Sequence, residues 1–382
     1  MTDSKALPMY FDYAATTPVD PRVIEPMFAH LTRDGVFGNP ASTTHVYGRQ
    51  AAEAVHQARA RVAALINARA EEIVWTSGAT ESNNLAIKGV AEFYCDRGRH
   101  IVTTAVEHSS VLAPCRWLQE RGYEVTYVAP QDDGTVCPET VARAIRDDTI
   151  LVSVMHANNE TGVVMDISSM AQVCRKRGVL FHVDAAQSAG KIPLDVSTAG
   201  VDLLSLAGHK LYAPKGVGAL YVRAEPPVRL VAQMHGGGHE GGMRSGTLAT
   251  HQIVAMGAAF ALAKDEMAAE EERLSQWRDR LATTLHSLGI GVIHGARAPR
   301  RLPGLLCVSF EGVEPSRLTA LLATMAVSAG SACRATDAKP SHVLMAMGVP
   351  PARIATAVRF SFGRFTTETE ITLLEQHLKN LK

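Results

Sequence analysis

The sequence predicts an α/β protein in which a mostly parallel sheet is flanked by helices, followed by a smaller α+β domain at the C-terminus. Three observations lead to this prediction. The 382 residues are 46% hydrophobic and 20% charged, so the chain can bury a large core. Short apolar runs alternate with segments of helical periodicity up to residue 222. After a long helical segment at 249–287 this alternation changes, which indicates the second domain.

The expected strands of the large sheet are short apolar runs, and a helix precedes them. The helix is predicted at 48–67, because apolar residues recur there at three- and four-residue steps and form one buried stripe. The stripe consists of Ala51, Val55, Ala58, Val62 and Leu65. The strands are expected at 72–76, 100–106, 124–129, 149–156, 179–186, 202–207 and 217–222.

The smaller domain is predicted from two more apolar runs, at 305–310 and 357–362, with a helix at 315–325 between them. We expect the boundary near residue 255, inside or at the start of the long helical segment. The large domain would then cover 16–255, and the small domain would combine 1–15 with 256–382.

Composition limits the classes of partner. Lys+Arg and Asp+Glu both number 38, so no overall charge favours nucleic acid or an anionic membrane. The N-terminus lacks the apolar core of a signal peptide, and the apolar window at 253–263 is too short to cross a bilayer. We therefore expect a cytoplasmic protein with no direct nucleic-acid or membrane partner. The six cysteines form no C-x-x-C pair, and the two histidines of HGGGH at 235–239 make an incomplete zinc site, so no metal is expected.

Polar residues follow five of the expected strands. Open parallel sheets bind ligands at the carboxyl ends of their strands, so these side chains are expected to meet at one edge. They are Thr80, with the backbone of Ala79, at the start of a helix, His108, Asn159, Asp184 with Gln187, and His209 with Lys210.

One ligand requires this combination. Pyridoxal 5′-phosphate needs a lysine for a Schiff base, an acid that keeps its ring nitrogen protonated, and an anion site such as a helix start for its phosphate. Lys210 is the expected anchor. Lys215 is the rival, but it follows Pro214 inside a turn, where its side chain is less well placed.

Several motifs resemble those of one family. They include FDYAATTPVDPRV, SGATESNNLAIKG, HVDAAQS, GHKLYAPKGVGALYVR, GGGHEGGMRSGTL, SAGSAC and VRFSFGRFTTE. In this order they resemble cysteine desulfurases of the IscS/NifS type, in the class V aminotransferase family, from about Tyr10 to the C-terminus. The resemblance implies a type I pyridoxal-phosphate fold, a homodimer, and conversion of L-cysteine to L-alanine. The sulfur is expected to remain as a persulfide on an enzyme cysteine and to pass to an acceptor protein, either an iron–sulfur scaffold or a DNA or tRNA modification enzyme.

The resemblance also implies a role for each matched residue. Lys210 binds the cofactor covalently, Asp184 pairs with its ring nitrogen, Gln187 donates to its ring oxygen, and His108 stacks on the ring and carries the proton of the substrate thiol. The phosphate is expected to contact Ala79, Thr80, His209 and, from the second subunit, Thr247. The substrate carboxylate is expected to contact Arg359 and Asn159, of which Asn159 also contacts the cofactor.

Cys333 is the expected sulfur acceptor within the chain. It lies among small residues and loop formers at 328–340, and the adjacent Arg334 favours its thiolate. One departure from the family is Ala207, where relatives commonly have a serine that contacts the phosphate. Another is the short C-terminus, which lacks the extension that housekeeping members use to dock the iron–sulfur scaffold. The alternative is a selenocysteine lyase or another class V lyase or aminotransferase, which needs no mobile cysteine.

Overall fold

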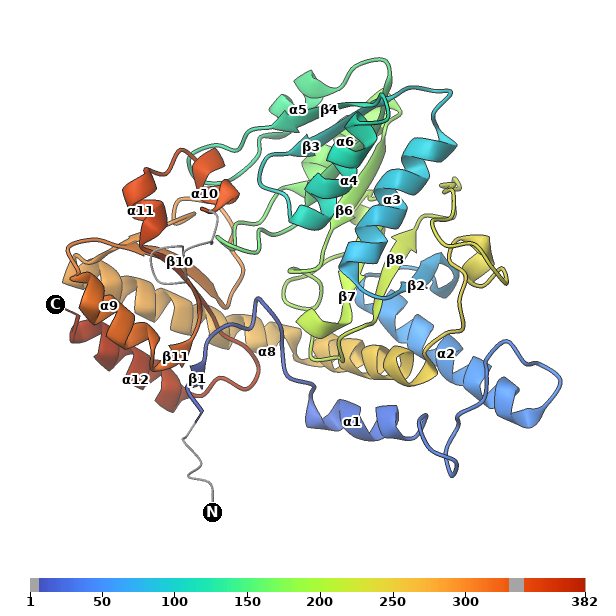
Figure 1. The fold of residues 1–382 in the computed structure, drawn as a ribbon, viewed down its shortest axis with the longest axis horizontal. Helices are drawn as coiled ribbons and strands as arrows, with labels where there is room; N and C mark the ends of the chain where they lie inside the picture. Colours follow the sequence, from blue (N-terminus) through green and yellow to red (C-terminus); the bar gives the residue numbers. More distant parts are fainter. Residues whose placement is uncertain (1–6, 330–339, 382) are drawn as a thin grey trace.

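The computed structural model describes residues 7–329 and 340–381. Within these ranges, a seven-stranded sheet with the order β2-β8-β7-β6-β5-β3-β4 forms the centre of the molecule (Figure 1). Only β8 is antiparallel to its neighbours, so the predicted mostly parallel sheet is confirmed. The strands are β2 (Ile73–Thr76), β3 (His100–Thr104), β4 (Glu124–Val128), β5 (Thr149–Met155), β6 (Leu180–Asp184), β7 (Leu203–Ala207) and β8 (Gly218–Val222).

Helices cover both faces of this sheet, because parallel strands need crossover connections. The helices α3 (Ala79–Phe93) and α4 (Ser109–Gln119) pack on one face through a core that includes Leu85 and Val111. The opposite face packs against α2 (Val46–Leu65), α6 (Ile167–Arg177) and the first half of α8 (Thr250–Leu288). Shorter helices are α1 (Pro21–Phe28), η1 (Ala70–Glu72), α5 (Pro138–Ala144), α7 (Val196–Ala199), η2 (Gly208–Lys210) and η3 (Glu240–Gly242).

The predicted stripe of α2 is buried at all five positions, which confirms the helix and its face. It packs against α8, where a Cβ at Gly257 would lie only 2.7 Å from the Ala58 Cα. The glycine therefore permits this close approach. Among the described residues, none of the helices is long and apolar enough to cross a membrane.

The C-terminal part contains a second, four-stranded antiparallel sheet with the order β12-β13-β10-β9. Its core joins the second half of α8 to α12 through residues such as Trp277 and Leu374. The strands predicted at 305–310 and 357–362 and the helix between them are present. The elements are β9 (Gly291–Ile293), β10 (Leu305–Phe310), α9 (Pro315–Leu322), β11 (Met325–Ala326), β12 (Ser328–Ala329), α10 (His342–Ala346), α11 (Pro351–Ala355), β13 (Ala357–Ser361) and α12 (Glu368–Lys379). Because α8 runs without interruption through position 255, the predicted domain division stays a prediction.

An N-terminal strap, residues 11–17, connects the two sheets. It follows β1 (Met9–Tyr10), which pairs in parallel with β11. The Ala14 backbone N–H donates to Ser361 Oγ at 2.9 Å, on the side of the smaller sheet. The Thr17 N–H donates to the His209 carbonyl at 3.0 Å, beyond the end of β7. The strap therefore passes along the carboxyl edge of the large sheet.

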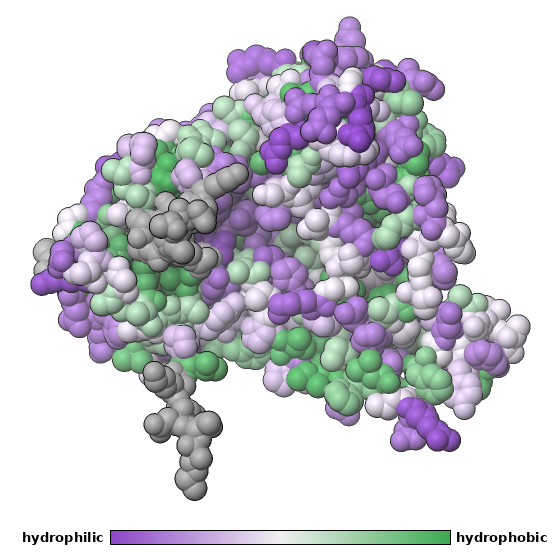
Figure 2. Space-filling model, in the orientation of Figure 1, coloured by the Kyte–Doolittle hydropathy of each residue, from purple (hydrophilic) through white to green (hydrophobic). Residues whose placement is uncertain are grey.

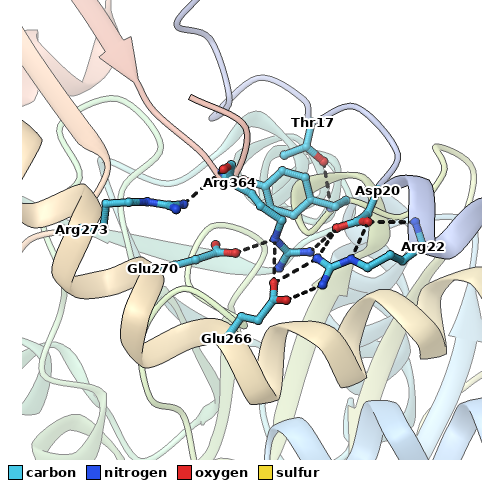
Figure 3. A network of polar contacts seen from close by, with 8 residues as sticks. Thr17, Asp20, Arg22, Glu266, Glu270, Arg273 and Arg364 are labelled. Atoms are coloured by element: carbon cyan, nitrogen blue, oxygen red, sulfur yellow. Dashed lines mark hydrogen bonds and ion pairs between the residues drawn. The ribbon is translucent and has the colours of Figure 1, made fainter. Parts of the chain in front are cut away.

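A network of charges with a buried centre lies just after this strap (Figure 3). Asp20, the N-cap of α1, accepts from Arg364 at 2.7 Å and from Arg22 at 2.8 Å. Arg364 also donates to Glu270 of α8 at 2.5 Å, and Glu266 of α8 pairs with both arginines. The side chains of Asp20 and Arg364 are only 1% and 6% exposed. The network thus joins α1, α8 and the loop after β13.

Candidate active site

A pocket of about 680 Å³ lies at the carboxyl ends of the large-sheet strands, beside the N-terminal strap. It brings together side chains that follow separate strands. Nine predicted site residues line it: Ala79, Thr80, His108, Asn159, Asp184, Gln187, His209, Lys210 and Arg359. Thr247 does not line this pocket in the single chain, and Cys333 with its neighbour Arg334 lies outside the described residues.

The start of α3 forms one end of the pocket. Gly78, its N-cap, has φ +151°, a value that L side chains rarely adopt. A Cβ at Gly218 would lie 2.5 Å from the Gly78 Cα, so a second glycine lets β8 approach this turn. The first backbone N–H groups of a helix have no partner within it, which makes the start at Ala79 and Thr80 suited to an anion.

His209 and Ala207 lie at the same end of the pocket. His209 Nδ1 lies 3.2 Å from Thr16 Oγ1 of the strap, and burial lowers the pKa of His209 to about 4. The ring is therefore neutral at physiological pH. Ala207 presents only a methyl group to the pocket, while Ser77 and Thr16 also line it.

Lys210 extends from the short helix η2, directly after β7. Its Nζ donates to the Ala14 carbonyl at 2.6 Å and to the Ala15 carbonyl at 2.8 Å. Burial, with a further contribution from the positive charge of Arg359, lowers the pKa of Lys210 to about 8. A lysine with this pKa has an appreciable neutral fraction near physiological pH, so it can act as a nucleophile or base.

Asp184 and Gln187 follow β6 and are each held by a neighbour. Asp184 accepts from the Ala186 N–H at 3.0 Å and from Asn83 Nδ2 at 2.8 Å. Gln187 donates from Nε2 to the Ala14 carbonyl at 2.9 Å, and its Oε1 accepts from Lys191 Nζ at 3.3 Å. The lysine therefore fixes which end of the amide is the donor.

His108 is the N-cap of α4. Its Nδ1 accepts from the Ser110 N–H at 3.1 Å and lies 2.8 Å from Ser110 Oγ. Burial lowers the pKa of His108, and the positive charge of Lys210 acts in the same direction, whereas Asp184 opposes it.

Arg359 lies on β13 and reaches the pocket from the smaller sheet. Its guanidinium donates to the Asn159 carbonyl at 2.7 Å, to Asp12 Oδ1 at 2.7 Å and to Ser328 Oγ at 2.8 Å. Its Nε is buried and has no hydrogen-bond partner among the described residues. Of the asparagine pair, Asn158 caps the turn by accepting two backbone N–H groups, whereas Asn159 lines the pocket.

The rival anchor, Lys215, also lines the pocket. In contrast to Lys210, its ammonium has no recorded hydrogen bond among the described residues; only its backbone carbonyl accepts, from Gln252. No three histidine, cysteine or acidic side chains in the described ranges are placed to hold a metal ion.

Sequence reasoning missed several groups that support the site. The strap carbonyls that bind Lys210 carry no signal in their residue type, and the pairing of Arg359 with Asp12 joins distant segments. Glu107 is fully buried, its Oε1 accepts from Thr104 and Met155, and burial raises its pKa to about 8. In the sequence, only its position between a predicted strand and His108 indicates that Glu107 lies near the site.

Comparison with known proteins identifies the family. The model of the class V aminotransferases matches residues 9–374. The chain is 56% identical over 365 residues to the cysteine desulfurase IscS of Shewanella sp. (strain ANA-3), covering 96% of this chain and 90% of the relative. Among solved structures, a NifS-like protein aligns with a TM-score of 0.89 at 36% identity, covering 98% of this chain and 99% of the other. A structure described as SspA in complex with cysteine aligns with a TM-score of 0.82 at 36% identity, covering 94% and 100%. The chain therefore belongs to the class V aminotransferase family, among the cysteine desulfurases of the IscS/NifS type.

Proposed function

We propose that the protein converts L-cysteine to L-alanine with the aid of pyridoxal 5′-phosphate and transfers the sulfur to Cys333 as a persulfide. The observation that carries the proposal is the pocket in which Lys210, Asp184, His108 and the start of α3 converge. The names of the relatives support the reaction, and the cysteine complex of SspA supports the substrate.

The residues of the pocket fit the cofactor. A phosphate would lie at the start of α3, where Gly78 leaves open space and the helix dipole favours an anion. The carboxylate of Asp184 would pair with a protonated ring nitrogen, and Gln187 would donate to the ring oxygen. Lys210 supplies the amine that the aldehyde requires. When bound, pyridoxal phosphate supplies an electron sink for charge that develops at the substrate α-carbon.

The chain's own side chains account for the remaining steps. Lys210 Nζ, with its pKa lowered to about 8, takes the α-proton of the substrate. Arg359 holds the substrate carboxylate, for which its buried Nε has a free hydrogen. The Cys333 thiolate attacks the substrate sulfur: an S–S bond forms, the C–S bond breaks, and the carbon skeleton keeps the electron pair and is protonated to alanine.

A homodimer completes this proposal. Thr247 does not line the pocket of its own chain, so a second subunit is needed for its expected contact with the phosphate. A patch of exposed apolar side chains on and after α1 supports an interface, and Figure 2 shows it as a green area below the centre of the molecule. The exposed large apolar side chains of residues 21–47 are Ile24, Phe28, Leu31, Phe37, Val46 and Tyr47. Exposed apolar patches commonly mark protein interfaces.

The same chemistry requires an acceptor for the sulfur, but it does not determine which protein that acceptor is. A persulfide on Cys333 needs a second thiol or a modification enzyme to receive the sulfur. We propose an iron–sulfur scaffold protein or an enzyme of DNA or tRNA sulfur modification. The cytoplasmic location stays a prediction.

The test is turnover of L-cysteine by five forms of the full-length enzyme. Wild type should release alanine in the presence of a reductant and carry one added sulfur on the peptide that contains Cys333, detected by mass spectrometry after quenching. Cys333→Ser should keep the cofactor and release no alanine, whereas Cys95→Ser, the matched control, should keep activity. Lys210→Ala should lose the visible absorbance of the bound cofactor, and Lys215→Ala should retain it. Alanine release by Cys333→Ser at the wild-type rate would overturn the proposal and favour a lyase. Sulfur found on another cysteine would overturn the assignment of Cys333.

A further inference from the structure

A continuous line of hydrogen bonds joins Asp184 to His108. Asn83 Nδ2 lies 2.8 Å from Asp184 Oδ2 and 2.8 Å from Ser110 Oγ, and Ser110 Oγ lies 2.8 Å from His108 Nδ1. Asp184, Asn83 and Ser110 are 6%, 0% and 7% exposed, so bulk water does not compete with the two bonds of Asn83, whereas the His108 side chain is exposed to the open pocket. The four residues come from the end of β6, from α3 and from the start of α4.

The direction of this line can be deduced from the chemistry of its members. A carboxylate only accepts, so the amide atom that faces Asp184 is the nitrogen of Asn83. The same nitrogen has a second hydrogen, which it donates to Ser110 Oγ. The Ser110 hydroxyl hydrogen must then find another acceptor, and His108 Nδ1 is the one recorded for it. Nδ1 therefore has a lone pair, and the hydrogen of the neutral ring is on Nε2.

The backbone enforces the same tautomer. His108 caps α4, an 11-residue helix, by accepting the Ser110 N–H at Nδ1. A hydrogen on Nδ1 would point at the Ser110 N–H, which can only donate, and a positive ring would face the positive end of the helix dipole. A helix N-terminus can keep a catalytic histidine neutral in this way, so that it acts as a hydrogen-bond donor.

Some groups around His108 lower its pKa and others raise it. Burial and the positive charge of Lys210 disfavour the imidazolium, as does the neighbouring His342, whereas Asp184 and Glu160 favour it; the net direction is a lowered pKa. His108 Nε2 has no recorded hydrogen-bond partner among the described residues, and the side chain lines the pocket.

We propose that Asn83 and Ser110 are positioning residues that hold His108 neutral with its hydrogen on Nε2, so that it presents an N–H donor to the pocket. This role of His108 rests on the proposed function only for the identity of the ligand that Nε2 faces. In the resting enzyme, the pocket-facing atom of the ring is then a hydrogen-bond donor.

The experiment is nitrogen-15 NMR of the histidine side chains in full-length enzyme, with the cofactor bound and after its removal. His108→Gln identifies the signal. Wild type should show the Nε2–H tautomer at neutral pH and a pKa below the ordinary value. Ser110→Ala removes the hydroxyl that needs Nδ1 as acceptor, so the pKa of His108 should rise by about 0.5 to 1 unit. Asn83→Leu should raise it as well, because Ser110 Oγ is then free to accept from Nδ1.

Ser109→Ala is the matched control, because Ser109 is exposed, precedes Ser110 directly and belongs to the same helix turn. It should leave the tautomer and the pKa of His108 unchanged. An Nδ1–H tautomer or an imidazolium in wild type at neutral pH would overturn the inference. So would a Ser110→Ala enzyme that titrates like Ser109→Ala, even if Asn83→Leu fails to fold. The NMR measurement needs no turnover. The tautomer of His108 can therefore be tested even if the enzyme shows no desulfurase activity.

Discussion

Replacing Arg364 with methionine should destabilise the protein through the network of Figure 3. The guanidinium is 6% exposed and bonds to Asp20 and Glu270, neither of which is accessible enough to be solvated instead. Breaking a buried ion pair by removing one partner costs about 3–5 kcal/mol. Because Arg22 continues to pair with Asp20, we expect the lower end, about 3 kcal/mol. With an unfolding entropy of about 2.1 cal/mol/K per residue over the 382 residues, Tm should fall by about 4 °C.

The assay is thermal and urea unfolding of the wild type and of two variants with the same substitution. Arg146→Met is the control, since Arg146 forms exposed pairs with Glu124 and Asp148, which are worth about 0–1 kcal/mol. Hydrogen bonds from Arg22 and Arg364 lower the pKa of Asp20. Ionised Asp20 therefore stabilises the folded protein at pH values above the pKa of a free aspartate, and this stabilisation is lost as the pH falls. The difference between wild type and Arg364→Met should therefore narrow below about pH 4. Equal destabilisation by both variants at neutral pH would refute the reasoning.

Two further predictions concern the cofactor site. Ala207→Ser should tighten cofactor binding about ten- to hundredfold in equilibrium dialysis, because a hydroxyl donor to a charged phosphate is worth about 1.5–3 kcal/mol; unchanged retention would show that the donors already present satisfy the phosphate. Lys191→Met should release Gln187 Oε1 from its donor, shift the visible spectrum of the bound cofactor and lower cysteine turnover about tenfold, whereas Lys191→Arg should recover part of both. A Lys191→Met enzyme with the wild-type spectrum would show that the amide of Gln187 is oriented by Ala14 alone.

The sequence predicted the large sheet well because all its strands except the edge strand β4 are buried along almost their whole length. Such strands form continuous apolar runs, and each of the seven predicted runs became a strand of β2 to β8. The errors are confined to ends: the run at 179–186 contains β6 (Leu180–Asp184), because Ala185 and Ala186 already belong to the turn that presents Asp184. Apolar composition does not mark that point.

The strand ends also predicted which side chains meet, but not how they are held. Lys210 could be placed at the edge from the apolar run before it. Its acceptors, the carbonyls of Ala14 and Ala15, are 196 and 195 residues away in sequence and belong to the main chain, which every residue type shares. The pairing of Arg359 with Asp12 likewise depends on how distant segments pack. Local patterns report burial and period, whereas these contacts depend on tertiary structure.

The N-terminal strap has a consequence for the order in which the enzyme is built. β1 pairs with β11, and Ala14 bonds to Ser361, a contact that spans 347 residues of sequence. During synthesis at about 5–20 residues per second, Ala14 waits about 20 to 70 s for this partner to emerge from the ribosome. Contacts of such long sequence separation form late in folding. The nascent chain can therefore complete the large sheet early, while the strap is joined to the smaller sheet only when synthesis is almost finished.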